Sequence, residues 1–181
     1  MLQLNVPERE LFDSDSQRFL TIPGFVLRLE HSLFSISKWE AEFQKPFFGK
    51  QEKTIAETLA YIRCMDLDAD TDPKLYSRLG RNEIDTIKCY ISDKQTATWF
   101  SEKPNHGPPN RETVTSELVY YWMITLGIPF ECQYWHFNRL QTLIRVCLLK
   151  QEKPRKMSRS ELASRNAALN AARRAKFGSL G

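Results

Sequence analysis

The hydrophobic period of the chain changes near Ser32, and this change limits the folds open to it. Before Ser32, apolar residues alternate with polar ones, as at Leu2, Leu4 and Val6. After it, in residues 33–43, apolar residues recur at spacings of three and four. Alternation is typical of a half-buried strand, and a period of about 3.6 is typical of an amphipathic helix. The sequence therefore predicts an α+β protein that is mainly α, with a small N-terminal antiparallel sheet packed on a helical domain.

The chain is expected to divide into three segments. Residues 1–31 form the N-terminal β-sheet segment of two to four strands, interrupted at Pro7 and Pro23. Residues 32–149 form a helical body that makes one globular unit with the sheet. Residues 150–181 form a basic linker and a C-terminal helix, which is rich in alanine and carries few large apolar side chains.

A short turn at Gly127–Pro129 joins the two most apolar stretches of the body. The first is a helix that ends at Leu126, and the second is a helix over about Phe130–Leu149. Helices joined by so short a turn commonly lie against each other. We therefore expect a central helical hairpin.

Charge separates the body from the C-terminal segment. From Lys150 onward there are 9 basic and 2 acidic residues, which leaves 17 basic and 20 acidic residues before it. Clustered cations attract polyanions or acidic protein surfaces. Docking on an acidic or helical protein is the favoured role of the basic helix, a solvated appendage is the second interpretation, and nucleic-acid binding is the third, because the acidic body would repel a polyanion.

Two groups of residues are expected to contact a partner. Aromatic residues in predicted loops would mark a protein-binding surface if they are exposed. These are Phe47, Phe48, Trp99 and Phe100. The second group comprises charged and amide residues of the C-terminal segment: Arg155, Lys156, Arg159, Arg165, Asn166, Asn170, Arg173, Arg174 and Lys176.

Two constellations resemble metal sites, but neither is complete. Aspartates alternate from Asp66 to Asp72 as at the start of a calcium loop, yet Thr71 replaces the expected glycine and Ser77 the closing glutamate. Cys132 and His136 stand four apart on the predicted second helix, without a second ligand pair. A solvated or docking loop and ordinary buried side chains are the favoured interpretations.

No sequence motif of a known catalytic or phosphate-binding type is present. Phosphate-cradling loops need glycines, and the chain has 7. The four cysteines form no CxxC pair and predict reduced thiols. We expect a protein that is not an enzyme, binds no cofactor and no metal, carries no signal peptide and crosses no membrane.

Several stretches resemble small proteins of the tail gene module of tailed bacteriophages. They are Ser35–Glu40, Lys45–Phe47, Ser116–Met123, Ile128–Gln133, Trp135–Leu140, Leu143–Cys147, Lys156–Ser158 and Ser164–Arg174. The resemblance covers nearly the whole chain. It implies a tail assembly chaperone, a factor of the host cytoplasm that coats the tape measure protein while tail-tube subunits polymerise around it. No residue roles follow from the resemblance.

The resemblance also leaves alternatives open. A structural virion protein of the tail or the head–tail connection would fit the predicted sheet, and a nucleic-acid-binding phage protein is a third possibility. The expected partners are the tape measure protein or other tail proteins, together with a second copy of the chain. The expected location is the host cytoplasm, or the virion in the structural alternative.

Overall fold

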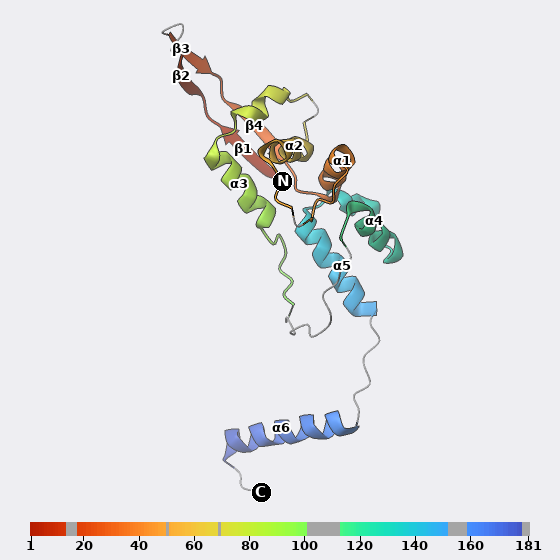
Figure 1. Ribbon diagram of the computed structural model, residues 1–181. Coiled ribbons are helices and arrows are strands. Elements are labelled where there is room, and N and C mark those ends of the chain that lie inside the picture. The colour runs from red at the N-terminus through yellow and green to blue at the C-terminus, as the bar shows by residue number, and fades with distance from the viewer. Residues whose placement is uncertain (14–17, 50, 69, 101–112, 152–158, 179–181) are drawn as a thin grey trace. The chain divides into compact units, whose positions relative to one another are not determined.

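A computed structural model divides the chain into two compact units, Met1–Leu148 and Leu149–Gly181. It describes residues 1–13, 18–49, 51–68, 70–100, 113–151 and 159–178. Among the described residues the chain is mainly helical, and a small antiparallel sheet packs against the helices (Figure 1). The predicted fold class is therefore confirmed.

The N-terminal segment forms one two-stranded antiparallel ribbon, which an interruption divides into two pairs of strands. Its strands are β1 (Leu2–Val6), β2 (Arg9–Asp13), β3 (Arg18–Ile22) and β4 (Phe25–Leu29). Leu2 pairs with Leu29 in the β1–β4 pair and Arg9 pairs with Ile22 in the β2–β3 pair, so one register runs through both. Sequence reasoning did not predict β2, whose alternation is weak.

The ribbon is interrupted where Pro7 stands opposite Gly24. Proline offers no backbone N–H, which ends the ladder at this level. The two backbones also approach closely, because a side-chain carbon on Gly24 would lie 2.9 Å from the Val6 carbonyl oxygen and 3.0 Å from the Glu8 nitrogen. Glycine is required here because there is no room for a side chain, and not because of its backbone dihedral angles.

The helices of the body follow in chain order. They are α1 (Leu33–Phe43), α2 (Ile55–Met65), the 3-10 helix η1 (Pro73–Arg78), α3 (Arg81–Ser92), α4 (Ser116–Thr125), the 3-10 helix η2 (Phe130–Tyr134) and α5 (Phe137–Gln151). Capping boxes start the first two, through Ser32 with Ser35 and through Thr54 with Glu57. The second of these boxes follows the Thr-x-x-Glu pattern of Thr54 and Glu57, which predicts a helix start, and the structure confirms it.

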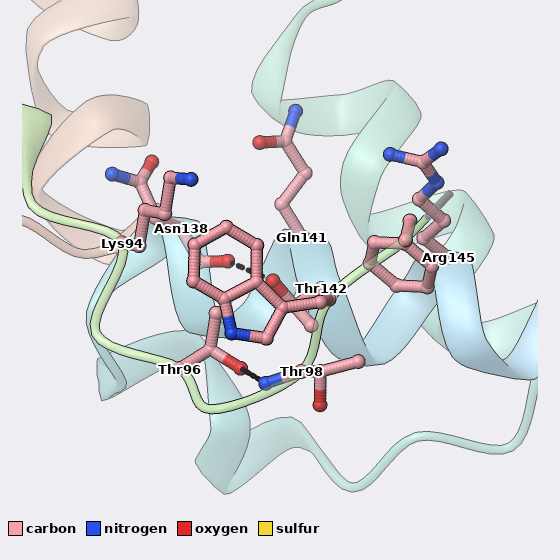
Figure 2. A pocket seen from close by; sticks show the side chains of 9 residues that line it. Lys94, Thr96, Thr98, Asn138, Gln141, Thr142 and Arg145 are labelled. Carbon is pink, nitrogen blue, oxygen red and sulfur yellow. Dashed lines mark hydrogen bonds between the residues drawn. The ribbon is translucent and has the colours of Figure 1, made fainter. Parts of the chain in front are cut away.

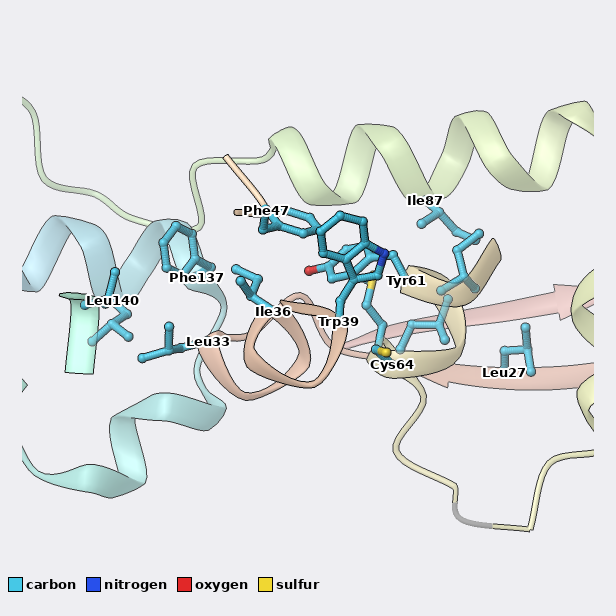
Figure 3. Packing of buried hydrophobic residues seen from close by; sticks show 14 of the residues in the cluster. Leu27, Leu33, Ile36, Trp39, Phe47, Tyr61, Cys64, Ile87, Phe137 and Leu140 are labelled. Carbon is cyan, nitrogen blue, oxygen red and sulfur yellow. The ribbon is translucent and has the colours of Figure 1, made fainter. Parts of the chain in front are cut away.

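The core lies between the β1–β4 pair and the helices of the body, and α1, α2, α3, α4 and α5 all contribute to it (Figure 3). The inner face of the β1–β4 pair contributes Leu27 and Leu29, both fully buried. From α1, Trp39 is buried and its indole N–H donates to the Glu57 carbonyl oxygen at 2.9 Å. The helical spacing of Ile55, Leu59, Ile62 and Met65 predicts Ile55 on the buried stripe of α2, but Ile55 is 80% exposed and lies outside the core.

The predicted long helix over Phe130–Leu149 is wrong at its start. Residues 130–134 form η2, and α5 begins only at Phe137. The reason is an attachment to the segment before α1: Ser32 bridges His136, and the Phe137 N–H donates to the His31 carbonyl oxygen at 2.7 Å. This extended connection separates the two helices of the expected hairpin, and α4 packs against α1.

The second unit contains α6 (Arg159–Phe177). Gly178 follows the last turn and has a positive φ of 62°; a glycine at this place in the sequence predicts the end of a helix, and the structure confirms it. Every side chain described on this helix is exposed. Arg155 and Lys156 lie outside the described residues, and so does Ser158, which the Ser-x-x-Glu pattern with Glu161 predicts as the capping residue.

Candidate functional site: an apolar surface of the body

Large apolar side chains are exposed on three elements of the body that contact one another, α1, α4 and η2. We call this the apolar surface and define it as Phe34, Tyr121, Ile124, Phe130 and Tyr134. Tyr121 and Ile124 are 60% and 63% exposed, and Phe130 and Tyr134 are 53% and 54% exposed. Exposed apolar side chains are common singly, but a group on adjoining elements is typical of a contact surface.

Ring contacts tie the three elements into this one surface. The rings of Phe34 and Tyr134 meet edge to face, with centroids 5.2 Å apart, and join α1 to η2. The rings of Tyr120 and Phe130 stack at 6.2 Å and join α4 to η2. The Tyr120 hydroxyl also donates to the Gln133 side-chain oxygen at 2.8 Å, which fixes η2 against α4.

The composition of α4 explains why apolar residues remain exposed. The helix is apolar on most of its circumference, but it buries only Ser116, Val119 and Met123. A helix that is apolar all round is normally buried on all sides. Here Tyr121 and Ile124 face outward, so α4 has an apolar side that the body does not cover.

A small cleft continues the apolar surface toward the loop after α2. Its volume is about 140 Å³, and Phe34, Leu67 and Tyr134 are among the residues that line it. Leu67 is 54% exposed. The Lys38 ammonium lies 4.5 Å from the centre of the Phe34 ring and borders the same region. The surface therefore offers a recess for an apolar side chain beside charged groups of both signs, since Glu30 and Asp66 also line the cleft.

The structure separates the four loop aromatics that were expected on a surface. Phe47 is buried in the core, 4.4 Å from the ring of Tyr61 by centroids, so its assignment to a partner surface is wrong. The short loop folds back because the Glu40 carboxylate accepts the Phe47 N–H at 2.6 Å. Phe48 is 40% exposed and stacks on Phe137 at 5.0 Å.

Trp99 and Phe100 lie in an extended segment after α3, away from Phe47 and Phe48. Trp99 is 80% exposed, and the Lys94 ammonium lies 4.3 Å from its ring centre. Phe100 is half-buried beneath the Arg145 guanidinium at 4.1 Å. These two aromatics line a pocket against α5.

The residues predicted on α6 stay exposed, as a partner-binding helix requires. They are Arg159, Arg165, Asn166, Asn170, Arg173, Arg174 and Lys176. Leu162 and Leu169 are about half exposed on the same helix, and Phe177 is 75% exposed. Charge and small side chains thus dominate the surface that α6 offers.

The two metal interpretations find no geometric support. Cys132 lies in η2 and His136 precedes α5, so they do not share a helix face. In the acidic loop, Asp66 accepts the Tyr76 hydroxyl and Asp68 pairs with Arg28. Within the described part of the chain, no three metal-binding side chains form a cluster that could hold an ion.

A buried histidine cluster lies at the junction of the sheet and the helices, and no pattern in the sequence predicts it. His31 and His136 are both buried, with ring centroids 5.2 Å apart. His136 Nδ1 accepts the Asn138 N–H at 3.3 Å, so its Nε2 carries the proton that is donated to the Tyr90 carbonyl oxygen at 3.0 Å. Burial, with a smaller effect of His136, lowers the pKa of His31 to about 3.

Buried next to this cluster, Tyr61 has a hydroxyl that pairs with His31 Nδ1. Burial raises the pKa of Tyr61 above its ordinary value. Both groups are therefore neutral near pH 7. The cluster acts in packing, where it joins the segment before α1 to the start of α5.

Comparisons with known protein families, with well-described proteins and with solved structures find no match for this chain. The described helices include none that is both long and apolar enough to cross a bilayer. The apolar surface and the exposed α6 are therefore the features on which a function has to be argued.

Proposed function

We propose that the chain is a non-enzymatic phage tail assembly chaperone that binds the tape measure protein during tail-tube assembly. The observation that carries this proposal is the apolar surface on a folded body. A chaperone has to cover apolar surface on its client and later release it, so it needs such a surface exposed in its free state. The sequence resemblance to tail-module proteins supplies the identity of the client.

The form of the apolar surface suits a helical client. Phe34 and Tyr134 border a recess, and Ile124 and Phe130 extend the apolar area along α4 and η2. An amphipathic helix binds such a surface through apolar side chains spaced by about one turn. A long helical client would offer this pattern repeatedly, which allows several copies of the chaperone to bind along it.

We assign α6 a separate contact. Its basic residues and its alanines are exposed along the whole helix, and it belongs to a compact unit of its own. A helix of this composition docks on an acidic helical surface through its small residues, while Arg173 and Arg174 pair with carboxylates at the edge. In this proposal, the body holds the client and α6 contacts the client or a neighbouring copy.

Co-purification tests the proposal. The chain and the tape measure protein of the same phage are expressed together, with an affinity tag on the client alone. We expect the untagged chain to be retained, and the tape measure protein to stay in solution only when the chain is present. A tape measure protein that is equally soluble alone and retains none of the chain would overturn the proposal.

A structural virion protein is the second candidate, and the β2–β3 pair favours it. This pair continues the ribbon beyond β1 and β4 (Figure 1). A two-stranded ribbon is only marginally stable in water unless other elements pack on it, and a permanent neighbour in a particle would cover it. Mass spectrometry of purified particles separates the candidates, because a virion protein is present in stoichiometric amount and a chaperone is absent.

A further inference from the structure

A pocket outside the apolar surface lies between α5 and the extended segment that follows α3. Asn138 fixes the start of this segment, because its side-chain amide donates to the carbonyl oxygens of Ile91 at 2.9 Å and Asp93 at 2.7 Å. Residues 94–100 of this segment and α5 line an open pocket of about 570 Å³. This volume is in the range of small-ligand pockets, which is roughly 300 to 1,000 Å³.

The pocket is cationic although the body as a whole carries more acidic than basic residues. Lys94 and Arg145 line it, and no Asp or Glu is present among the described residues of its wall. Within the described part of the chain, neither cation forms an ion pair. Figure 2 shows Lys94 beside Asn138 at one end and Arg145 at the other. A ligand in this pocket would therefore be anionic.

Trp99 adds a flat apolar surface to this charge. The indole is 80% exposed, and the Lys94 ammonium lies over it at 4.3 Å. An exposed indole in a cationic groove is the side chain on which nucleic-acid bases stack. Gln141 lines the pocket between the two cations, and an amide can donate to and accept from the polar edge of a base (Figure 2).

From these contacts we propose that the pocket binds a nucleobase that carries a phosphate. The base stacks on Trp99, Gln141 meets its polar edge, and one of the two cations, Lys94 or Arg145, holds the phosphate, while the other is free to hold the next phosphate of a strand. The same chemistry is presented by a free nucleotide and by single-stranded nucleic acid. This pocket does not involve the basic tail, for which nucleic-acid binding was the least favoured role because the body is acidic. The proposal also goes beyond client binding, which we assign to the apolar surface.

Binding of two probes to the full chain tests this site. The probes are adenosine monophosphate and a single-stranded oligonucleotide of about ten nucleotides, within the usual span of such sites. Titration calorimetry measures the first, and fluorescence anisotropy of a labelled strand measures the second. Binding of the mononucleotide supports a free-nucleotide site, and binding of the strand alone supports the same pocket as a strand site.

Variants separate the pocket from other contacts. Trp99→Leu is expected to weaken binding roughly tenfold, since base stacking on an aromatic side chain contributes about 1–3 kcal/mol. Arg145→Gln is expected to weaken it and to reduce its salt dependence. Lys150→Gln is the matched control, because it removes an exposed cation from the same helix outside the pocket.

Three results would overturn the proposal. The first is no binding of either probe at millimolar concentration. The second is binding that Trp99→Leu leaves unchanged or that Arg173→Gln on α6 abolishes, since the tail would then hold the probe. The third is competition by inorganic phosphate or a polyglutamate peptide as strong as competition by the nucleotide, because the pocket would then recognise charge alone.

Discussion

The Glu40 carboxylate on α1 accepts the backbone N–H of Ser116, the first residue of α4, at 2.7 Å. Its other oxygen accepts the Phe47 N–H at 2.6 Å. Thr115 precedes the helix without capping it through its side chain, so Glu40 supplies the negative group that the start of α4 needs. One buried carboxylate therefore holds α4 and the loop after α1 in place.

Glu40→Ala should lower the free energy of unfolding by about 3 kcal/mol, because two buried N–H groups lose a charged acceptor. Urea denaturation followed by tryptophan fluorescence measures the change. Glu42→Ala on the same helix is the matched control: Glu42 pairs with Arg63 at the surface, so its loss should cost less than about 1 kcal/mol. Equal losses in the two variants would contradict the role of Glu40.

Acid should destabilise the body first through His31. Its pKa is about 3 in the folded state against 6.5 for an ordinary histidine, so between these values the unfolded chain binds more protons. The contribution of His31 to the free energy of unfolding is therefore fully present above pH 6.5. It is lost as the pH drops toward 3, with a limiting slope of about 1.4 kcal/mol per pH unit.

Denaturation series between pH 7 and pH 4.5 isolate this effect. Lys45 and Thr54 lower the pKa of Glu57 from 4.5 to about 2, so the loss due to Glu57 lies below this range. A free energy of unfolding that stays constant from pH 6.5 to pH 5 would show that His31 is not buried in its neutral form.

Gly24→Ala should destabilise the ribbon by about 1 to 3 kcal/mol, since the added methyl group would press on the backbone at Val6 and Glu8. Thermal unfolding of the two variants Gly24→Ala and Val26→Ala compares a crowded position with an open one. Val26 lies in β4 and is half exposed, so its truncation should change stability by less than about 0.5 kcal/mol. A tolerated Gly24→Ala would mean that the strands separate at this level.

Deleting residues 154–181 should leave the body folded. These residues belong to the second compact unit, and α6 buries none of its described side chains. The free energy of unfolding is expected to change by less than about 0.5 kcal/mol, while binding of the client or self-association weakens. Loss of cooperative unfolding in the shortened chain would show that the body depends on its tail.

Local signals in the sequence predicted much of the fold. The alternation at β1 and β4, the capping box at Thr54 and the terminal Gly178 are all encoded within a few residues of the element they define. The start of α5 was not predictable in this way. It depends on a hydrogen bond from Phe137 to His31, which lies more than a hundred residues earlier in the chain.

The candidate site was predicted only in part. The exposure of α6 follows from its composition, and the exposure of Trp99 follows from its position in a loop. Phe47 occupies a similar loop, but Glu40 draws it into the core, and no local pattern indicates that contact. The apolar surface was missed because α4 is apolar on most of its circumference, and periodicity alone does not say which side faces outward.

Binding of the tape measure protein to Ile124→Arg and Ile55→Arg variants tests the central claim most directly. Both isoleucines are exposed on helices of the body, but only Ile124 belongs to the apolar surface. We expect Ile124→Arg to weaken binding at least about tenfold with unchanged stability, and Ile55→Arg to bind as the unmodified chain does. Equal affinities in all three proteins would contradict client binding by the apolar surface.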